Sequence, residues 1–416
     1  MTSIILIIIG VIISILFSSF IIPRILVVAF RKRLFDVPDE RKVHQGIVPR
    51  LGGLSFAPSI LFTLSFTTGL RYLIGDGIPE EMLCFIIPEF YFLVCGLTLL
   101  FLTGIKDDLV GLRYRSKFVM QILAAIMVPL SGLWINNLYG IFGIHELTPW
   151  LGVPLTVFLI VFICNAINLI DGIDGLASGL SCVSLAILGC LYVHNHLWMY
   201  AMLAFASFGV LVPFFYYNVF GKVERCRKIF MGDTGSLTLG YILSFLIIRY
   251  TVCAPDIIPY SDGAIIVAFS TIIIPMLDVM RVMFVRWRSH KGIFVADKNH
   301  IHHKLLSMGL TQRQAMLLIL TIACLFSGVN ICLISYIDNN IPVIMWATVG
   351  MIDSSASSYY AHWTSPAGKA ISYNTKLHCV LLVGYDENNY YFNDPMHMNA
   401  DGVKYPTTSP LSVSAM

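Results

Sequence analysis

Charged residues are scarce in this chain of 416 residues, since Asp, Glu, Lys and Arg together make up only 12% of it. Soluble domains usually carry about 25%. Hydrophobic residues make up 57%, and the mean hydropathy is +0.79, which argues against a soluble enzyme. The ten cysteines form no CxxC pair, so nothing indicates a zinc-ribbon or redox motif. No internal repeat of fixed period is present.

Long uncharged runs make up most of the chain. A bilayer core is crossed by about 20 apolar residues in a helix, and ten runs reach that length approximately. They cover residues 3–23, 51–70, 84–104, 118–134, 149–168, 176–193, 197–217, 235–250, 263–283 and 315–336. An eleventh run, 341–352, is too short to span. We therefore predict an all-α polytopic membrane protein with ten transmembrane helices and a truncated eleventh.

Basic residues predict the orientation of these helices. Of the 24 Lys and Arg residues before position 350, alternating loops place 22 on one side and only Arg71 and Arg249 on the other. Cytoplasmic loops hold Lys and Arg in excess, so this side is expected to be cytoplasmic and the N-terminus to lie outside. A basic loop follows the first run in place of a small-residue cleavage site, which predicts a retained helix.

The composition changes after Ile352. The last 64 residues are rich in Ser, Tyr and Asn, and they alternate like strands in LHCVLLVGYD (377–386) and in YYF before Asn393. We predict a membrane-embedded domain at 1–352 and a small α+β or irregular fragment at 353–416.

Four polar groups interrupt the apolar pattern, and the loop alternation places all of them at cytoplasmic helix ends. They are Asp107 and Asp108 in GIKDDLVGLRYRSK, Asn165, Asn168, Asp171 and Asp174 in NAINLIDGIDGLASG, Asp233 in MGDTGS, and His300, His302 and His303 in KNHIHHKL. Their shared side of the membrane is the main indication of one functional site.

The acidic and amide groups each allow a structural interpretation as well. Adjacent carboxylates at Asp107 and Asp108 repel each other unless a cation or proton neutralises them, which suits Mg²⁺ held together with substrate phosphates. Otherwise they form a solvated acidic loop. Asn165, Asn168 and Asp171 recur every three residues, so a helix would stack them on one face. The alternative is an interfacial helix cap.

The MGDTGS segment and the histidine cluster also allow more than one interpretation. MGDTGS precedes an apolar run, so its amides could bind phosphate at a helix N-terminus, or Asp233 could simply cap the helix. The histidine cluster, surrounded by Lys and Arg, favours pyrophosphate. A zinc site lacks supporting ligands at the right spacing, and a polybasic lipid-facing loop is the third alternative.

Taken in order, the strings PDERKVHQGIVPRLGGL, GIKDDLVGLRYRSK, NAINLIDGIDGLASG, MGDTGS and HIHH resemble the polyprenyl-phosphate N-acetylhexosamine-1-phosphate transferases. This membrane superfamily also includes the phospho-MurNAc-pentapeptide transferases. The HIHH form is similar to the bacterial branch that uses UDP-N-acetylglucosamine or a close relative. The resemblance covers residues 1 to about 350.

The resemblance implies a reaction in the bacterial plasma membrane. UDP-HexNAc and undecaprenyl phosphate would give undecaprenyl-diphosphate-HexNAc and UMP, which initiates a cell-wall or surface polysaccharide. Its partners would be these two substrates and the lipid bilayer, without nucleic acid, and a homodimer is compatible with it. The cofactor would be Mg²⁺, with Mn²⁺ as an alternative.

The resemblance also assigns roles to residues. The metal ligands would be Asn168 and Asp233, and the catalytic residues Asp107, Asp108 and Asp171. The substrate-binding residues would be Lys117, Asp174, His300, His302 and His303. Direct attack by the lipid phosphate is the preferred mechanism, with a covalent phospho-aspartate at Asp107 or Asp108 as the alternative.

Two other functions compete with the transferase. Ten spans alone would suit a transporter or flippase of a lipid-linked or anionic solute, but transporters place ionisable groups near the bilayer midplane. The second alternative is a membrane-anchored peptidase, because HCVLLVGYDENNYYFNDP resembles the histidine-containing half of a C39-like papain-fold peptidase. By that resemblance His378 would be the base and Asp394 its partner. No Cys lies between residue 351 and His378, so we predict an inactive fragment.

Overall fold

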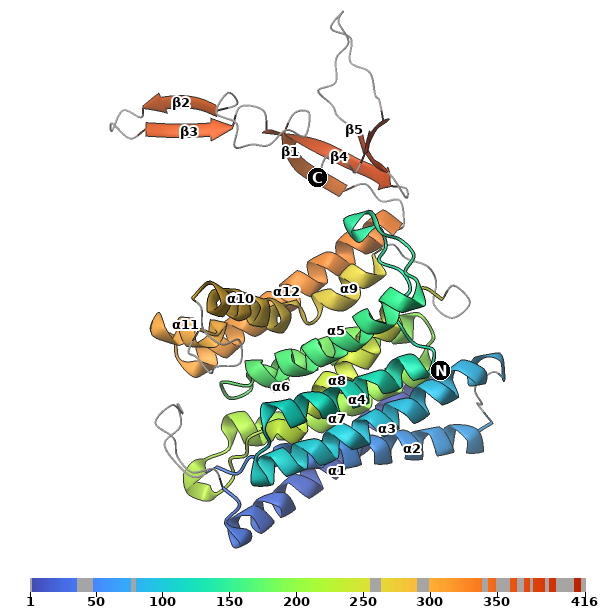
Figure 1. Ribbon diagram of the computed structural model, residues 1–416, viewed down its shortest axis with the longest axis vertical. Coiled ribbons are helices and arrows are strands. Elements are labelled where there is room, and N and C mark those ends of the chain that lie inside the picture. The colour runs from blue at the N-terminus through green and yellow to red at the C-terminus, as the bar shows by residue number, and fades with distance from the viewer. Residues whose placement is uncertain are drawn as a thin grey trace, which may run out of the picture. The chain divides into compact units, whose positions relative to one another are not determined.

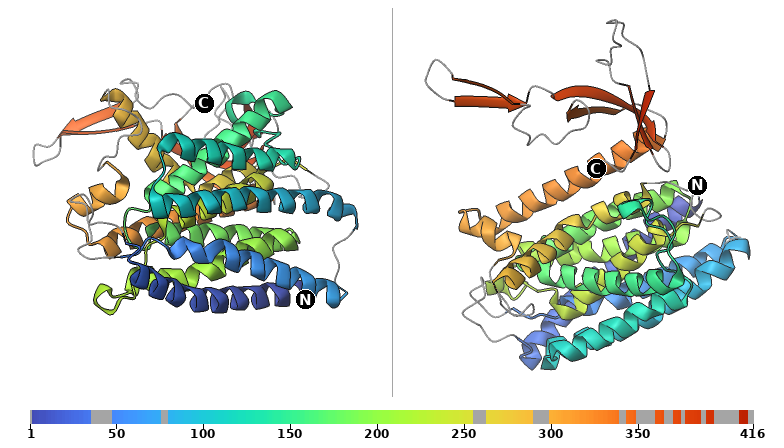
Figure 2. Two further views of the ribbon diagram at one scale, coloured as in Figure 1. Left: turned by 60° about the horizontal axis from the view of Figure 1, so that its bottom comes forward. Right: turned by 45° about the horizontal axis from the view of Figure 1, so that its top comes forward.

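The computed structural model describes residues 2–35, 48–75, 80–254, 263–289 and 299–338, together with six C-terminal strands. The chain divides into two compact units, Met1–Ser327 and Gly328–Met416. The helices are α1 (Thr2–Lys32), α2 (Phe56–Leu73), α3 (Glu80–Val110), α4 (Tyr114–Leu130), α5 (Pro149–Ile170), α6 (Leu176–His194), α7 (Trp198–Phe215), α8 (Gly232–Thr251), α9 (Ala264–Ser270), α10 (Ile273–Arg288), α11 (Ile301–Ser307) and α12 (Gln312–Asp338). In the first unit the long helices lie side by side in a bundle (Figures 1 and 2).

A helix occupies each of the ten predicted span positions, but the count of ten spans is not confirmed. In the described residues seven helices are long and apolar enough to cross a membrane, or eight if α9 and α10 form one broken span. The remaining two are α4, with 17 residues, and α8. The chain is a multi-pass membrane protein.

Helix α8 is the central helix of the bundle and packs against α3 and α5. Nearly all of its side chains are buried, including the hydroxyls of Thr234, Ser236 and Thr238. Protein rather than lipid surrounds it, so its polar residues find partners within the bundle. This explains why α8 can be less hydrophobic than the helices around it.

The predicted span 263–283 is broken, with α9 and α10 meeting at 78°. Pro275 cannot donate a backbone hydrogen bond to the preceding turn. The carbonyls exposed at the break are satisfied from other helices, because Ser184 Oγ donates to Thr271 O at 2.6 Å and Ser327 Oγ donates to Ser270 O at 3.1 Å. The break directs α10 toward the loop that carries the histidines.

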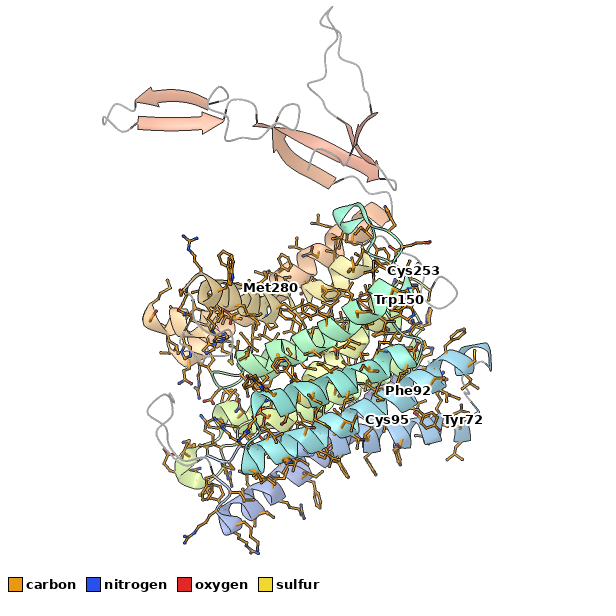
Figure 3. All side chains as sticks on the ribbon, viewed as in Figure 1. Tyr72, Phe92, Cys95, Trp150, Cys253 and Met280 are labelled. Carbon is orange, nitrogen blue, oxygen red and sulfur yellow. The ribbon has the colours of Figure 1, made fainter. Side chains whose placement is uncertain are left out.

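The outer surface of the bundle is apolar, as a lipid-facing surface must be. Cys95 of α3 is exposed and so is Met280 of α10; both are labelled in Figure 3. Tyr72 and Trp150 are exposed at the end of the bundle that carries the N-terminus, away from α11 (Figures 1 and 3). Exposed Tyr and Trp at a helix end are typical of a membrane–water interface.

The second unit contains β-structure. Its strands are β1 (Val343–Thr348), β2 (Tyr360–Thr364), β3 (Ala370–Asn374), β4 (Leu377–Tyr385), β5 (Asn389–Asn393) and β6 (Thr408–Ser412). Four strands form an antiparallel sheet in the order β1-β4-β5-β6, and β2 pairs with β3. Strands β4 and β5 occupy the two positions predicted from the alternation.

The prediction of a truncated eleventh helix at 341–352 is wrong where the structure describes this segment. Val343–Thr348 form β1, which pairs with β4 in a register that places Val343 opposite Leu382. The segment is rich in β-branched and aromatic residues that favour strands, and a run of 12 residues cannot span a bilayer as a helix. Pairing with β4 is therefore the arrangement that satisfies its backbone.

Candidate active site at one end of the bundle

Asp233, in the first turn of α8, is the centre of a polar cluster. Its Oδ1 accepts a hydrogen bond from Lys117 Nζ of α4 and one from Asn168 Nδ2 of α5 at 2.5 Å. Asn168 Nδ2 also lies 2.8 Å from Ser236 Oγ. Three motifs that are far apart in the sequence thus meet at one carboxylate.

The two adjacent carboxylates at the end of α3 have different partners. Asp108 accepts hydrogen bonds from the backbone amides of Asp233 at 2.7 Å and Thr234 at 2.9 Å, and one from Thr234 Oγ1 at 2.5 Å. Asp107 accepts from Leu112 N at 2.7 Å and lies 3.0 Å from Lys117 Nζ. Asp108 therefore caps the N-terminus of α8 from another helix, and Asp107 holds Lys117 beside Asp233.

Close backbone packing makes these contacts possible. A Cβ atom at Gly104 of α3 would lie 2.4 Å from Thr234 Cα, and one at Gly53 would lie 2.0 Å from Gly235 N. Gly232 has a φ of +72°, which few residues with a side chain adopt. The glycines in LGG and MGDTGS are thus required by the approach of three segments to the start of α8.

The segment PRLGG packs against the MGDTGS segment through its backbone. Gly52 N donates to Phe230 O at 2.9 Å, Gly53 N to Met231 O at 2.8 Å, and Phe230 N to Pro49 O at 2.9 Å. This part of the first basic loop has a structural role. Arg41, Lys42 and His44 of the same loop lie outside the described residues.

Asn165 has a different neighbour from Asn168. Its Nδ2 donates to Gln121 Oε1 at 2.8 Å, one turn along α4 from Lys117. The pair Gln121–Asn165 forms a second polar layer between α4 and α5, beneath the layer that contains Asp233. Asn165 thus supports the site rather than joining the cluster around Asp233.

The loop after α5 adds two more carboxylates. The pKa of Asp171 is raised to about 7, mainly by burial and also by the carboxylates of Asp174, Asp233 and Asp108, against a lowering effect of Arg50. Asp174 accepts a hydrogen bond from Lys228 Nζ at 2.5 Å. The loop is fixed by Asn218, whose Oδ1 accepts from Gly175 N at 2.7 Å and whose Nδ2 donates to Ile229 O at 2.8 Å.

The histidine motif is anchored by Asp278 of α10. His300 Nδ1 lies 2.8 Å from Asp278 Oδ2. Asp278 Oδ1 accepts from Ile301 N, the first residue of α11, at 2.8 Å and from Arg281 Nη2 at 2.7 Å. Asp278 thus caps α11 from outside and holds the ring of His300 in one orientation.

His302 connects the histidine motif to the loop after α5. A Cβ atom at Gly172 would lie 2.1 Å from His302 Nε2, so the imidazole packs directly on the backbone of that loop. The pKa of His302 is lowered to about 4, mainly by burial and also by His303 and His300, against a raising effect of Asp278, so the ring is neutral near pH 7. The ring of His303 lies 4.3 Å from that of His302.

The structure also brings in residues that the sequence did not single out, mainly Lys228, Ser236, Asp278 and Asn218. An ionisable residue within an apolar span is a functional candidate by default, and this signal could have identified Asp278. Lys228 lies among several basic residues, and the pattern did not distinguish it. Its partner Asp174 is 54 residues away in sequence.

The donor set of the cluster fits a hard divalent cation. Its carboxyl groups are Asp107, Asp108, Asp171, Asp174 and Asp233, and its cations are Lys117, Lys228 and Arg50, so the carboxyl groups outnumber the cations by two. In the described part of the chain, no three His, Cys, Asp or Glu side chains already form a metal-ligand group. Carboxylate and amide oxygens are the ligand types that magnesium prefers, commonly one or two of them together with substrate phosphates and water.

Comparison with known proteins agrees with these motifs. The model of glycosyl transferase family 4 matches residues 90–251, which include Asp107, Asn168 and Asp233. The chain is 31% identical over 307 residues to the undecaprenyl-phosphate alpha-N-acetylglucosaminyl 1-phosphate transferase of Yersinia pestis, covering 73% of this chain and 78% of the relative. It is 32% identical to the protein of the same description from Escherichia coli K12, covering 73% and 77%.

A third relative is described as a probable undecaprenyl-phosphate N-acetylglucosaminyl 1-phosphate transferase of Bacillus subtilis. It is 32% identical over 326 residues, covering 77% of this chain and 83% of the relative. The chain belongs to glycosyl transferase family 4. As a family 4 protein it is a membrane transferase, as its sequence motifs predicted.

The C-terminal part of this family 4 protein matches a different family, the Peptidase_C39 like family, over residues 331–412. The predicted resemblance to this family is confirmed. Strand β4 carries His378, while Asp394 lies outside the described residues. The predicted boundary between Ile352 and Asp353 and the inactivity of the fragment stay predictions.

Proposed function

We propose that this protein transfers HexNAc-1-phosphate, with GlcNAc-1-phosphate as the preferred group, from UDP-HexNAc to undecaprenyl phosphate. The products are undecaprenyl-diphosphate-HexNAc and UMP. The observation that carries the proposal is the convergence of Asp107, Lys117, Asn168 and Asp233 at the ends of apolar helices. Such a position lets a soluble nucleotide sugar meet a lipid phosphate at the membrane surface. The names of the relatives give the substrate class.

Charge explains why this cluster suits phosphoryl transfer. The reaction brings together several phosphate charges, so catalysis depends on positioned cations and on neutralisation of charge in the transition state. Lys117 already lies between Asp107 and Asp233, where it can hold the acceptor phosphate once that phosphate displaces one carboxylate. Lys228 pairs with Asp174, and the ring of His302 packs on Gly172 between Asp171 and Asp174, so these two groups are the candidates for binding the diphosphate of the nucleotide.

Magnesium would be held by Asp233 and Asn168, as the resemblance implies, and would supply charge neutralisation at the diphosphate. The described residues leave suitable oxygens for it. Asp233 uses Oδ1 for its two side-chain donors, which leaves Oδ2 for a cation. The side-chain bonds of Asn168 are made by its nitrogen, which leaves its oxygen.

Direct attack by the acceptor phosphate is the mechanism that the contacts support better. Three donors, from Asp233 N, Thr234 N and Thr234 Oγ1, hold both carboxylate oxygens of Asp108. A covalent phosphate on Asp108 would have to break this cap. Asp107 and Asp108 are better placed to position Lys117 and α8. Burial raises the pKa of Asp108 to about 6 and that of Asp171 to about 7, and of these two carboxyls Asp171 has the pKa that better suits proton transfer near pH 7.

The test is UMP release from UDP-GlcNAc by the purified protein with undecaprenyl phosphate and magnesium. Release should require the lipid, stop on metal chelation, and fall by about 100-fold or more in Asp233→Asn, the size of effect seen when one transition-state group is lost. Glu224→Gln, an exposed change in the loop before Lys228, is the matched control and should retain activity. Lipid-independent hydrolysis, or no release with any UDP-HexNAc, would overturn the proposal.

A further inference from the structure

Glu89 of α3 and Arg249 of α8 form an ion pair inside the bundle, at the far end from the candidate active site. Arg249 lies in the last turn of α8, at the end of the bundle where Figure 3 labels Cys253 and Trp150. Its Nε is 3.6 Å from Glu89 Oε2, and Arg249 and Glu89 are only 2% and 5% exposed. Ionisable groups within membrane helices are costly and mark functional candidates. The proposed chemistry at Asp233 does not use this pair.

Tyrosines of two further helices surround the pair. Tyr200 of α7 donates from its hydroxyl to Glu89 Oε2 at 2.6 Å, and the Arg249 guanidinium lies 5.5 Å from the centre of the Tyr200 ring. Tyr192 of α6 stacks on Tyr200 with ring centroids 5.4 Å apart, and it donates to Leu246 O of α8 at 2.5 Å. The last two turns of α8 are therefore in contact with α3, α6 and α7.

The pair is a poor source of stability. Two buried charges recover their lost hydration only when the geometry is good and their remaining donors are satisfied. Here the ion-pair distance is longer than a hydrogen bond, and among the described residues Nε and Nη2 of Arg249 have no hydrogen-bond partner. Apolar side chains of similar size would fill the same space without this cost. What a buried polar pair can provide instead is the selection of one arrangement of its helices.

Helix α8 connects this pair to the active site. It carries Arg249 in its last turn and Asp233 in its first, about 24 Å apart at 1.5 Å per residue. Between them α8 is almost entirely buried, and a Cβ atom at Gly96 of α3 would lie 2.0 Å from the hydroxyl oxygen of Tyr241. Because close-packed interiors transmit strain, a shift of the far end of α8 would reach Asp233.

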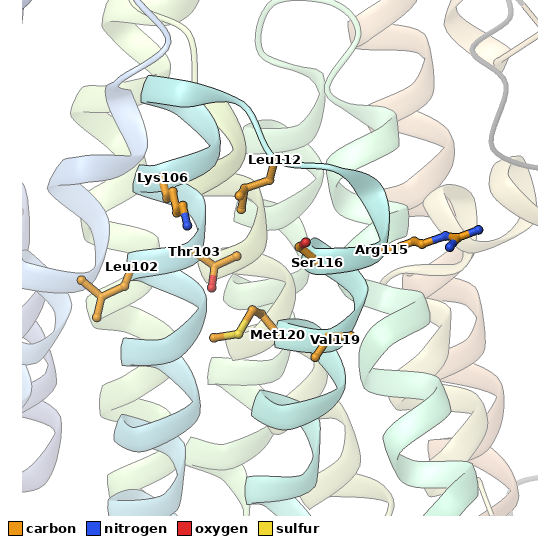
Figure 4. A pocket seen from close by; sticks show the side chains of 8 residues that line it. All are labelled: Leu102, Thr103, Lys106, Leu112, Arg115, Ser116, Val119 and Met120. Atoms are coloured by element: carbon orange, nitrogen blue, oxygen red, sulfur yellow. The ribbon is translucent and has the colours of Figure 1, made fainter.

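The side of α3 that faces α4 is less closely packed near the active site. A pocket of about 510 Å³ lies between the two helices there, and Figure 4 shows Thr103 of α3 and Met120 of α4 beside it. Contacts with α8 therefore do more to fix this end of α3. They include the hydrogen bonds that Asp108 accepts from the backbone amides of Asp233 and Thr234.

We propose that Glu89 and Arg249 are positioning residues, which fix α8 at one axial position against α3 and so keep Asp233 beside Lys117 and Asn168. The proposal rests on the proposed function for the role of Asp233. A displacement by one helical turn, about 5.4 Å, would bury the charge of Arg249 without its carboxylate, so the pair selects one position. A role in packing alone is the competing explanation, and the experiment separates the two.

The main variant removes the polar groups of this cluster together. Glu89→Leu, Tyr200→Phe and Arg249→Met in one chain leave none of these charges or hydroxyls unpaired, so this triple variant should unfold in detergent at or above the wild-type temperature. Its kcat for UMP release should nevertheless fall by about tenfold or more, because α8 is no longer held at one position. Hydrogen exchange of residues 232–236 should accelerate by about tenfold or more. Arg249→Met alone, which leaves Glu89 without its cation, should unfold at a lower temperature.

The control is Ile7→Ala, which opens a cavity at a buried position of α1, a helix that packs on α2 and α7. It should lower the unfolding temperature but keep kcat and the exchange of residues 232–236 within about twofold of wild type. A triple variant with wild-type kcat and exchange, or one that loses as much stability as Arg249→Met, would overturn the proposal. Exchange needs no turnover. If no UDP-sugar gives UMP with the wild type but exchange still accelerates in the triple variant, the positioning role stands and the proposed transfer reaction fails.

Discussion

Gly172 is needed because the ring of His302 occupies the space of a side chain at that position. A Cβ there would lie 2.1 Å from His302 Nε2 and 2.4 Å from Cε1. His302 is buried and cannot move away without leaving the loop after α5. Because Gly172 lies between Asp171 and Asp174, the positions of these two carboxylates depend on the position of α11.

Gly172→Ala should therefore reduce UMP release by about tenfold or more and destabilise the protein by about 1–3 kcal/mol, because overpacking displaces the ring or the loop. Activity and thermal unfolding in detergent would measure both effects. Gly69→Ala, in α2 with nothing near its Cβ, is the control and should unfold at or above the wild-type temperature. In a double-mutant cycle, His302→Ala should remove the stability cost of Gly172→Ala; additive losses would contradict the contact.

Asp171 should make the folded protein less stable as pH rises, and a bound metal ion should offset this loss of stability. Burial and neighbouring carboxylates raise the pKa of Asp171 from 3.8 to about 7, so the folded protein keeps a proton that the unfolded chain releases. Stability contributed by this group is lost as pH rises from the unfolded pKa through about 7. Above that range the ionised carboxylate repels Asp174 and Asp233.

Without metal, Asp171→Asn and wild type should unfold at similar temperatures only below about pH 4, the advantage of the variant should grow between about pH 4 and about pH 7, and at about pH 8 the variant should unfold several degrees higher. Excess magnesium should raise the wild-type unfolding temperature more than that of the variant, since a cation neutralises the ionised carboxylate. Scanning calorimetry with and without chelator measures this. A variant that is less stable than wild type in chelator at the higher pH would contradict the assignment.

Several residues of the site could be predicted individually, while their partners could not. Asp107, Asn168 and Asp233 interrupt apolar runs where a polar residue needs a reason. The ion pair between Lys228 and Asp174 and the anchor at Asp278 depend on which helix ends become neighbours, and hydropathy does not contain that information. The pattern also grouped Asn165 with Asn168, although Asn165 pairs with Gln121.

At the scale of elements, α11 depends on one carboxylate of another helix. Asp278 accepts hydrogen bonds from Ile301 N and Arg281, and pairs with His300. A helix of seven residues is too short to be stable by itself. The position of the histidine motif therefore depends on α10, which the break after α9 has redirected.

Asp278→Ala should lower the rate of UMP release by about 10- to 100-fold, the usual effect of removing a group that orients a functional histidine. Asp278→Asn should recover part of the activity, since its amide oxygen still accepts from Ile301 N. Hydrogen exchange of residues 301–307 should speed up in the alanine variant. Unchanged exchange together with lost activity would mean that Asp278 acts otherwise than by positioning α11.

Hydropathy predicted the positions of the helices well, but it predicted neither the break within the span 263–283 nor the strand at 343–348. A run of apolar residues predicts a helix at 263–283, yet only tertiary contacts with Ser184 and Ser327 make the break after Ser270 tolerable. The segment at 343–348 looked like a helix for the same reason that it works as a strand, because Val, Ile and Trp suit either one. Its partner β4 decides the outcome.

At the scale of the whole molecule, the transferase should not need the C-terminal strands. The family 4 match ends at residue 251 and the peptidase-like match begins at residue 331. Unlike the strands, helix α12 should be needed by the transferase, because it packs on the segment after α5. Met316 Sδ would lie 2.6 Å from a Cβ at Gly175, and Leu320 packs against Gly179. It covers the loop that carries Asp174.

A chain that ends after Asp338 should therefore release UMP at a rate within about twofold of the full chain, because the site and its supports remain. Ending the chain before Gln312 should abolish release by exposing the loop at Gly175, which buried apolar contacts now hold. Both chains would be compared at equal amounts in the membrane. Loss of activity in the chain that ends after Asp338 would show that the strands support the transferase domain.

The membrane orientation of the whole bundle determines whether the site can meet its nucleotide substrate. The excess of Lys and Arg predicts that the end with α11 is cytoplasmic and the end with Leu73 faces outward. Cys226 is exposed near Lys228, and Leu73 is 86% exposed at the end of α2. In chains with one cysteine each, an impermeant maleimide should label Leu73→Cys in intact cells, and Cys226 only after the membrane is opened. The reverse pattern would place the site outside, where a cytoplasmic nucleotide sugar could not reach Asp233, and would contradict the proposed reaction together with the orientation.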